Sequence, residues 1–449
     1  MAVSTRASFV ETLFLSNLLS PDQFAEVPAG DDDESPRALA KQLIEKGLLT
    51  RWQAQELLKG RTQFFLGKYK LLETLGQGGM GSVFTAEHTA MHRVVALKVM
   101  SKALLKNEDA IARFQREIRS AAALNHPNIV AAYDADCVKD TYFLVMEYVA
   151  GNTMKEWVKA HGALPIEWSC ECIWQAANGL QHAFERNMVH RDIKSSNLLV
   201  VPDEATAQPV VKILDMGLAR FASETGRESG EITQTGQIMG SPDYIAPEQA
   251  KSAKDADIRA DIFGLGCTLF ELLTGRLPYL GDTVMEKLMN RAIAPAPRVS
   301  SIRPDCPPAL DEIVARMLER DPKRRYQTPG EVAAALAPIK QGAHAPEGTT
   351  IIARQTDVAG GSSLPSNADE TYGSALDNVA SRVIEEPSFS SGSSPRIVRR
   401  KKGPDKAIWI GLGVLAVVVL LLGIFILSGG SFSSKSTKKK SRSAAAAEE

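Results

Sequence analysis

A glycine-rich stretch between two strand-like segments constrains the fold most. Residues 75–83 read LGQGGMGSV, which places Gly76, Gly78 and Gly81 in G-x-G-x-x-G spacing. Glycines let backbone N–H groups approach phosphate oxygens without side chains in the way. The same spacing opens dinucleotide-binding Rossmann folds, but those continue into a helix. Here the apolar segment VVALKVM follows instead, with a single amine, Lys98, so the pattern predicts a phosphate-binding turn between strands.

Lys98 has two interpretations. A lone lysine in an apolar strand can be an edge residue with its amine in solvent. However, a carboxylate that could hold the amine, Glu117, lies 19 residues further on in the helical pattern DAIARFQREIRSAAALNH. Such a pair is useful where an amine must be aimed at phosphate groups.

A second polar stretch interrupts an apolar pattern at VHRDIKSSNLLV, residues 189–200. It combines a carboxylate, Asp192, with an amine, Lys194, and an amide, Asn197. Such a loop could hold a metal ion and move a proton. The alternative is a surface turn between two strands.

Taken in order, these motifs resemble those of the protein-kinase family, specifically the bacterial membrane-anchored Ser/Thr kinases. The resemblance covers residues 69–338, where strand-like and helix-like segments alternate. It implies an α+β, bilobal kinase fold with a β-rich small lobe and a helical large lobe. A small helical region would precede it, and a disordered linker and one transmembrane helix would follow.

The resemblance also implies a role for each chemical group. Asp192 would accept the proton of a substrate hydroxyl, Lys194 would steady the transferred γ-phosphoryl group, and Asn197 would bind Mg²⁺. The segment ILDMGLAR is similar to the metal-binding motif usually written DFG, with Asp215 as the bridging Mg²⁺ ligand. Met216 replaces the usual Phe, and this flexible side chain of similar volume can fill the same pocket.

The segment FLVMEYVAG looks like the hinge that binds adenine. The carbonyl of Glu147 and the N–H of Val149 would bind the edge of the base, and Met146 would line the back of the pocket. The other ATP-binding residues that the resemblance implies are Gly76, Gly78, Gly81, Val83, Ala96, Lys98, Glu117 and Leu199.

Two segments near the middle of the chain are similar to parts of the kinase substrate platform. IAPEQ supplies Glu248, the acid that usually closes the activation segment of kinases in a structural role. Arg325 in DPKRRYQT is its expected partner. GSPDY precedes it, and in protein kinases this segment helps to form the platform for a peptide. Both segments favour a kinase that acts on proteins over a phosphotransferase that acts on small molecules.

A regulatory switch is also expected. Arg191 precedes Asp192, and its guanidinium beside a metal site and basic neighbours would be neutralised by a phosphate. Thr233 and Thr235 occupy the stretch that the resembling kinases autophosphorylate. Ser241 stands nearer the catalytic loop and is expected to bond Asp192 and Lys194 instead. The alternative is that both threonines are ordinary polar loop residues.

The predicted function is therefore ATP-dependent phosphorylation of protein serine and threonine hydroxyls, with ATP and Mg²⁺ required. Lys194, two residues after the catalytic Asp, is the feature of Ser/Thr members. The alternative is a membrane-tethered pseudokinase scaffold, but Lys98, Asp192 and Asp215 are all present. The net charge of −1 argues against nucleic acid as the main partner. A homodimer is left open.

The first 66 residues contain a weak repeat at an offset of 30. FVETLFLSNLLSPDQ, from Phe9, matches LAKQLIEKGLLTRWQ, from Leu39. Each copy ends in a helix-capping pattern, Ser20-x-x-Gln23 or Thr50-x-x-Gln53. We expect two helical hairpins that act in protein interaction or autoregulation. Chance similarity, or a helical cap that only adds stability, are the alternatives.

The end of the chain predicts a membrane anchor. Residues 339–406 are rich in Gly, Ser and Pro, and 407–427 form an uncharged apolar run long enough to cross a bilayer as a helix. A buried core helix is the alternative. Residues 428–449 form a short basic tail. Glu11 interrupts what would have to be the apolar core of a signal peptide, so we expect no secretion signal. The five cysteines lack a CxxC pair and suit a reducing cytosol. Together with the requirement for ATP, they predict one pass through the inner (cytoplasmic) membrane and a cytosolic kinase domain.

Overall fold

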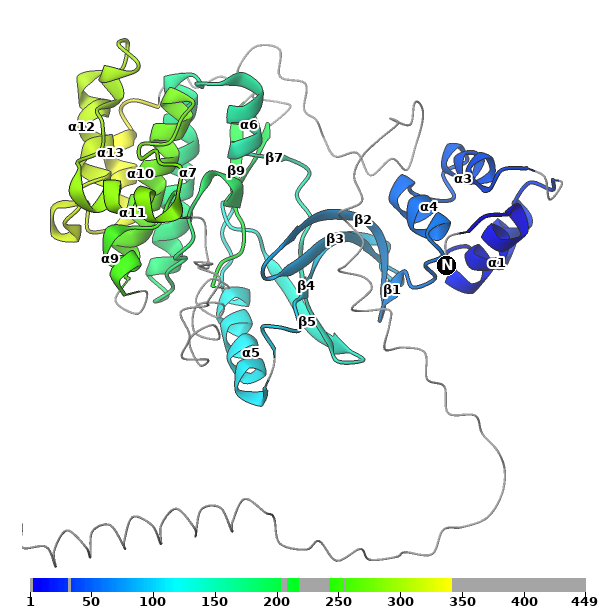
Figure 1. The fold of residues 1–449 in the computed structure, drawn as a ribbon. Helices are drawn as coiled ribbons and strands as arrows, with labels where there is room; N and C mark the ends of the chain where they lie inside the picture. The colour runs from blue at the N-terminus through cyan, green and yellow to red at the C-terminus, as the bar shows by residue number, and fades with distance from the viewer. Residues whose placement is uncertain are drawn as a thin grey trace, which may run out of the picture. The chain divides into compact units, whose positions relative to one another are not determined.

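The computed structural model describes residues 3–30, 34–105, 107–202, 208–217, 242–252 and 256–340 (Figure 1). Among these residues, no helix combines the length and apolar character needed to span a membrane. The predicted span at 407–427, most of the predicted linker and the basic tail lie outside the described ranges.

The N-terminal region contains two pairs of helices, α1 (Arg6–Ser16) with α2 (Pro21–Ala25) and α3 (Pro36–Glu45) with α4 (Arg51–Leu58). Both predicted capping boxes are confirmed, because Ser20 and Gln23 cap α2, and Thr50 and Gln53 cap α4. The helices enclose a core of apolar side chains that are at most 3% exposed: Phe9, Leu13, Leu18, Leu39, Ala40, Leu43, Leu49, Ala54, Leu57 and Phe64. Burial on this scale stabilises by about 1.5–3 kcal/mol for each large side chain.

The small lobe is built on one antiparallel sheet with the strand order β1-β2-β3-β4-β6-β5. Its strands are β1 (Phe65–Leu66), β2 (Tyr69–Gly78), β3 (Gly81–His88), β4 (Arg93–Met100), β5 (Ala132–Val138) and β6 (Thr141–Glu147). Helix α5 (Glu108–Ala122) contacts β5. Strand β1 lies inside the range that the sequence assigned to the helical region, because two residues are too short to show a periodicity.

The large lobe is mainly helical (Figure 1). Its helices are α6 (Met154–His161), α7 (Ile166–Phe184), α9 (Pro247–Lys251), α10 (Ile258–Thr274), α11 (Val284–Ile293), α12 (Pro308–Met317) and α13 (Pro329–Leu336), with 3₁₀ turns η1 (Ser195–Asn197), η2 (Val299–Ser301) and η3 (Pro322–Arg324). Three short strands, β7 (Asn152–Thr153), β8 (Leu198–Pro202) and β9 (Pro209–Ile213), form a second sheet. Helix α10 is buried on nearly every side, as a helix that is apolar all round should be. A β-rich lobe followed by a helical lobe is the predicted α+β architecture.

Candidate active site

The glycine-rich stretch forms the turn that joins β2 to β3. Gly78 pairs with Gly81, and Gly76 pairs with Val83. Gly81 has φ +140°, and a Cβ there would lie 1.9 Å from the carbonyl oxygen of Val99, so only glycine fits. Added Cβ atoms at Gly76 and Gly78 would meet nothing within 4 Å. These two positions therefore leave the open space that a phosphate chain would need.

Lys98 is buried on β4, and its amine contacts a carboxylate at the start of the predicted metal motif. The distance from Lys98 Nζ to Asp215 Oδ1 is 2.7 Å. Burial alone would raise the pKa of Asp215, but the ion pair and hydrogen bond with Lys98, together with the charges of His190 and Lys194, hold that pKa below its ordinary value. Asp215 is therefore a carboxylate at neutral pH, the form that binds a cation.

Glu117, the carboxylate expected to hold Lys98, lies on α5 beside the same motif. A Cβ built on Gly217 would lie 3.7 Å from Glu117 Oε2. Helix α5 thus brings Glu117 next to the segment that carries Asp215. The Lys98–Glu117 pair itself stays a prediction.

The catalytic-loop residues meet within one turn of chain. Lys194 Nζ donates to Asp192 Oδ2 at 2.6 Å. Asn197 Nδ2 donates to the Asp192 carbonyl at 2.8 Å and to Asp192 Oδ2 at 3.2 Å. These hydrogen bonds fix the carboxylate of Asp192 in one orientation and leave the amide oxygen of Asn197 as the atom that can bind a cation.

Two buried residues hold this loop in place. His190 is fully buried, its Nδ1 accepts from the Asp192 N–H, and its Nε2 donates to the Leu214 carbonyl at 2.7 Å. Asp261 on α10 accepts the N–H groups of His190 and Arg191, both at 2.7 Å. Arg191 has φ +67°, a strained conformation for a non-glycine residue, and the two bonds from Asp261 oppose that strain. Sequence reasoning missed Asp261.

Three of the predicted adenine-pocket residues lie on adjoining strands of the small lobe, and Leu199 lies on β8 of the second sheet. Ala96 on β4 is opposite Met146 on β6, and both are buried in one cluster against which Val83 packs. On β8, Leu198 and Val200 are fully buried whereas Leu199 is half-buried, as alternation along a strand requires.

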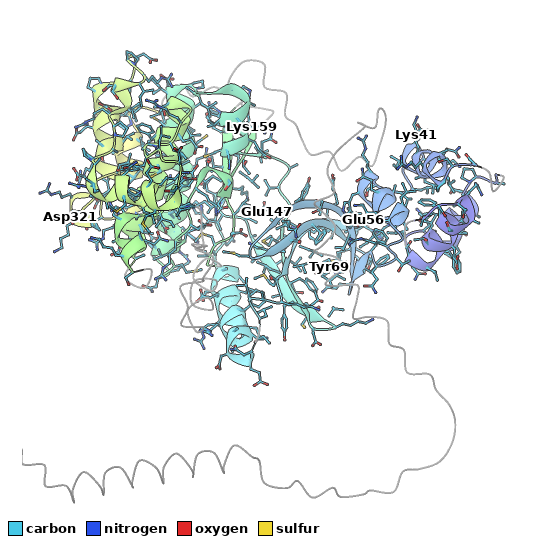
Figure 2. All side chains as sticks on the ribbon, in the orientation of Figure 1. Lys41, Glu56, Tyr69, Glu147, Lys159 and Asp321 are labelled. Atoms are coloured by element: carbon cyan, nitrogen blue, oxygen red, sulfur yellow. The ribbon has the colours of Figure 1, made fainter. Side chains whose placement is uncertain are left out.

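The hinge joins the two lobes through an ion pair as well as through the chain. Lys212 Nζ on β9 donates to both carboxylate oxygens of Glu147, at 2.8 and 2.9 Å. Figure 2 labels Glu147 at the end of the small-lobe sheet. Its carbonyl and the N–H of half-buried Val149 therefore belong to a chain segment that this ion pair holds at Glu147.

The segment before α9 lies against the catalytic loop. The hydroxyls of Tyr244 and Ser195 are 2.9 Å apart, and Tyr244 donates to Glu271 at 2.5 Å. Tyr244 also lines a small pocket together with Arg191 and Asp192. A peptide bound on this segment would therefore lie close to the carboxylate of Asp192.

Glu248 and Arg325 form the pair that the sequence predicts. Arg325 Nη1 and Nη2 donate to the two oxygens of Glu248 at 2.6 and 2.8 Å. The Arg325 side chain is fully buried. This bidentate pair joins α9 to the end of the large lobe.

The predicted regulatory residues are only partly described. Arg191 Nε is buried and has no hydrogen-bond partner among the residues that the structure describes. Thr233, Thr235 and Ser241 lie in residues 218–241, outside the described ranges.

The described residues fit a divalent cation that also binds phosphate. Across the described ranges, no group of three or more His, Cys, Asp or Glu side chains gathers as a metal cage. Asp215, which pairs with Lys98, can donate a carboxylate oxygen, and Asn197, whose carbonyl accepts from the Leu214 N–H at 2.9 Å, can donate its amide oxygen. Mg²⁺ is characteristically held by one or two protein oxygens together with substrate phosphates and water.

This chain is similar to known protein kinases. Residues 69–335 match the model of the protein kinase domain. The chain is 32% identical over 358 residues to serine/threonine-protein kinase PrkC of Bacillus subtilis, covering 79% of this chain and 53% of that protein. It is 34% identical over 339 residues to serine/threonine-protein kinase PknB of Mycobacterium leprae, covering 74% of this chain and 51% of that one. The chain thus spans about half the length of these curated relatives.

A solved structure, the Mycobacterium tuberculosis PknI kinase domain, is 25% identical and covers 61% of this chain and 97% of that one, with a TM-score of 0.48. The domain match alone covers more than half of the chain. The chain therefore belongs to the protein kinase family.

Proposed function

We propose that this chain transfers the γ-phosphoryl group of ATP to serine and threonine hydroxyls of proteins. The observation that carries the proposal is the catalytic loop, where Lys194 and Asn197 both donate to the carboxylate of Asp192. Nearby, Lys98 is paired with Asp215. The names of the bacterial relatives, which are serine/threonine-protein kinases, support the choice of acceptor.

The chain's own residues account for the transfer. Asp192 accepts the proton of the substrate hydroxyl as its oxygen bonds to the γ-phosphorus, while the bond from that phosphorus to the β,γ-bridging oxygen breaks and ADP leaves. Lys194 neutralises charge on the transferred group, and Lys98 is the amine aimed at the phosphates. Positioning and electrostatics supply most of the rate enhancement in such reactions.

We propose Mg²⁺ as the cation, held by Asp215 and Asn197. When bound, it supplies positive charge that neutralises the phosphate oxygens. The lowered pKa of Asp215 supports this role, because a carboxylate must be ionised to bind a cation.

A pseudokinase scaffold is the alternative, and the gathered groups favour the enzyme. A scaffold has no need for a carboxylate oriented by two donors, or for a buried amine paired with Asp215. A small-molecule phosphotransferase is disfavoured by the segment at Tyr244, which the Tyr244–Ser195 hydrogen bond fixes beside the catalytic loop, where a peptide substrate would bind.

The test is to incubate the full chain with γ-labelled ATP, Mg²⁺ and a general protein substrate, and then to hydrolyse the product. We expect labelled phosphoserine and phosphothreonine, with no transfer when EDTA removes the metal. Label on tyrosine alone, or none at all, would contradict the proposal.

We further propose that Thr233 and Thr235 are autophosphorylated and that the phosphate pairs with Arg191. The buried, unpartnered Nε of Arg191 among the described residues supports this, since such a donor calls for an acceptor. Mass spectrometry of the same incubation should find phosphate on one or both threonines, and changing both to Ala should lower turnover more than ATP affinity. A fully active preparation with both unmodified would exclude the mechanism.

Membrane attachment is a separate proposal. We propose that residues 407–427 cross the inner membrane once, with the kinase domain in the cytosol. The uncharged run of 21 residues supports it, because about 20 apolar residues span a bilayer as a helix. Protease added to intact spheroplasts should spare the kinase domain, and its digestion would overturn this topology.

A further inference from the structure

The N-terminal helical region packs directly on the small lobe through α4. The ring of Trp52 lies 5.8 Å from that of Phe64 and 5.8 Å from that of Phe84, a buried residue of β3. Trp52 thereby joins the core of the helical region to the core of the small-lobe sheet. Helix α4 lies against β2 (Figure 1).

The contact falls on a bulge in β2. Leu71 pairs with Ala86 and Glu73 with Thr85, so Leu72 is an extra residue in the strand. A bulge disrupts the ladder and leaves backbone groups in need of other partners.

Two side chains of α4's capping box donate to the carbonyls at this bulge. Gln53 Nε2 donates to the Leu71 carbonyl at 2.7 Å, and Thr50 Oγ1 donates to the Leu72 carbonyl at 2.6 Å. Gln53 is only 1% exposed. Figure 2 labels Glu56 on α4 and Tyr69 on β2, the two elements that these bonds join. Lys70 Nζ adds a third bond, to the Leu18 carbonyl at 2.9 Å.

The first repeat shows that a capping box does not require its glutamine to be buried as Gln53 is. Ser20 and Gln23 make the same reciprocal bonds at the start of α2, but both residues are exposed. In the second repeat, Gln53 Oε1 accepts from the Thr50 N–H while Nε2 reaches the small lobe. The second box therefore makes an additional contact between domains.

We propose that Thr50 and Gln53 are positioning residues that fix the base of β2 and so set the affinity of the glycine-rich turn for nucleotide. Strand β2 continues from the bulge, through a second register shift between Thr74 and Gly76, to Gly76 and Gly78. A strand held at its base has less freedom to lose when the turn closes over phosphates, so binding is tighter. The rate measurements rest on the proposed kinase function, whereas the binding measurements do not.

The decisive variant is Gln53→Glu in the full chain, with Gln23→Glu as its matched control. Each glutamate keeps an acceptor for the cap, but at position 53 the donor to Leu71 is lost. We expect the Kd for ADP and the KM for ATP to rise at least about three-fold in Gln53→Glu, because one hydrogen bond is lost and a buried carboxylate is placed against the Leu71 carbonyl. The kcat at saturating ATP should stay within about two-fold, and Gln23→Glu should match the wild type.

A second pair of variants guards against misfolding. Thr50→Val removes the donor to Leu72 together with the cap acceptor for the Gln53 N–H, and Thr50→Ser restores both. Nucleotide affinity should fall in the first and return in the second.

The possible results distinguish a positioning role for Thr50 and Gln53 from the role of a purely structural cap. A merely structural cap predicts that the active fraction, and with it kcat, falls while KM and Kd stay constant. That result, or equal effects of Gln53→Glu and Gln23→Glu, would overturn the proposal. If Kd for ADP rises but no variant or wild-type protein transfers phosphate, the positioning role stands and the proposed kinase function fails.

Discussion

Replacing Asp192 by Asn is expected to lower kcat by about 10²–10⁴-fold, the usual contribution of a group that moves a proton. The amide has the same shape and can still contact Lys194 and Asn197, but it cannot accept the proton of the attacking hydroxyl. A 10³-fold loss corresponds to about 4 kcal/mol of activation free energy. Initial rates of labelled phosphate transfer at saturating ATP give this value directly.

The control for Asp192→Asn is nucleotide affinity. Asp192 contacts Lys194 and Asn197, whereas Lys98 and Asp215 form a separate ion pair. The Kd for ADP should therefore change by less than about three-fold, and the Tm should stay close to that of the wild type. A variant that retains more than about a tenth of the activity would show that Asp192 is not the proton acceptor. A wild type as inactive as the variant would favour the scaffold.

Local motifs carry most of the candidate site. Asp192, Lys194 and Asn197 lie within six residues, and their contacts need only one turn of chain. Lys98 could be recognised because an amine is unusual within the apolar run VVALKVM. Its contact with Asp215 could not, because the two residues meet only when the lobes have formed.

Contacts between residues that lie far apart in the chain could not be predicted from the sequence. Asp261 is 71 residues from His190, and its only signal is an acid in the apolar pattern IRADIFGLGCTLF, which shows a buried charge but not its partner. The partner of Gln53 could not be predicted either. Its acceptor is a backbone carbonyl, which any residue could provide, so no side chain marks it in the sequence. The two capping boxes look alike in sequence, and only packing distinguishes the buried one from the exposed one.

The largest effect on stability is expected at Glu248. Replacement by Ala leaves the guanidinium of Arg325 buried, with the carbonyls of Glu319, Arg259 and Arg320 as its hydrogen-bond acceptors and the ring of Phe263 beneath it. Removing one member of a buried ion pair costs about 3–5 kcal/mol, since the other charge is left without compensation. Glu248 keeps some contact with solvent, so we expect about 3 kcal/mol and a decrease in Tm of about 6 °C or more.

Two further variants test whether the loss of stability comes from the buried, unpaired charge of Arg325. Glu312→Ala breaks the pair with Arg298, which has a similar distance of 2.7 Å but exposed side chains, and it should change the free energy of unfolding by less than about 1 kcal/mol. Combining Glu248→Ala with Arg325→Met removes the orphaned charge and should recover part of the lost stability, because an apolar side chain tolerates that site better than an unpaired guanidinium. Denaturant titration of all three proteins measures the differences. Equal losses in the buried and exposed variants would mean that Glu248 acts only through its local helix, and that the bidentate pair contributes nothing to holding α9 in place.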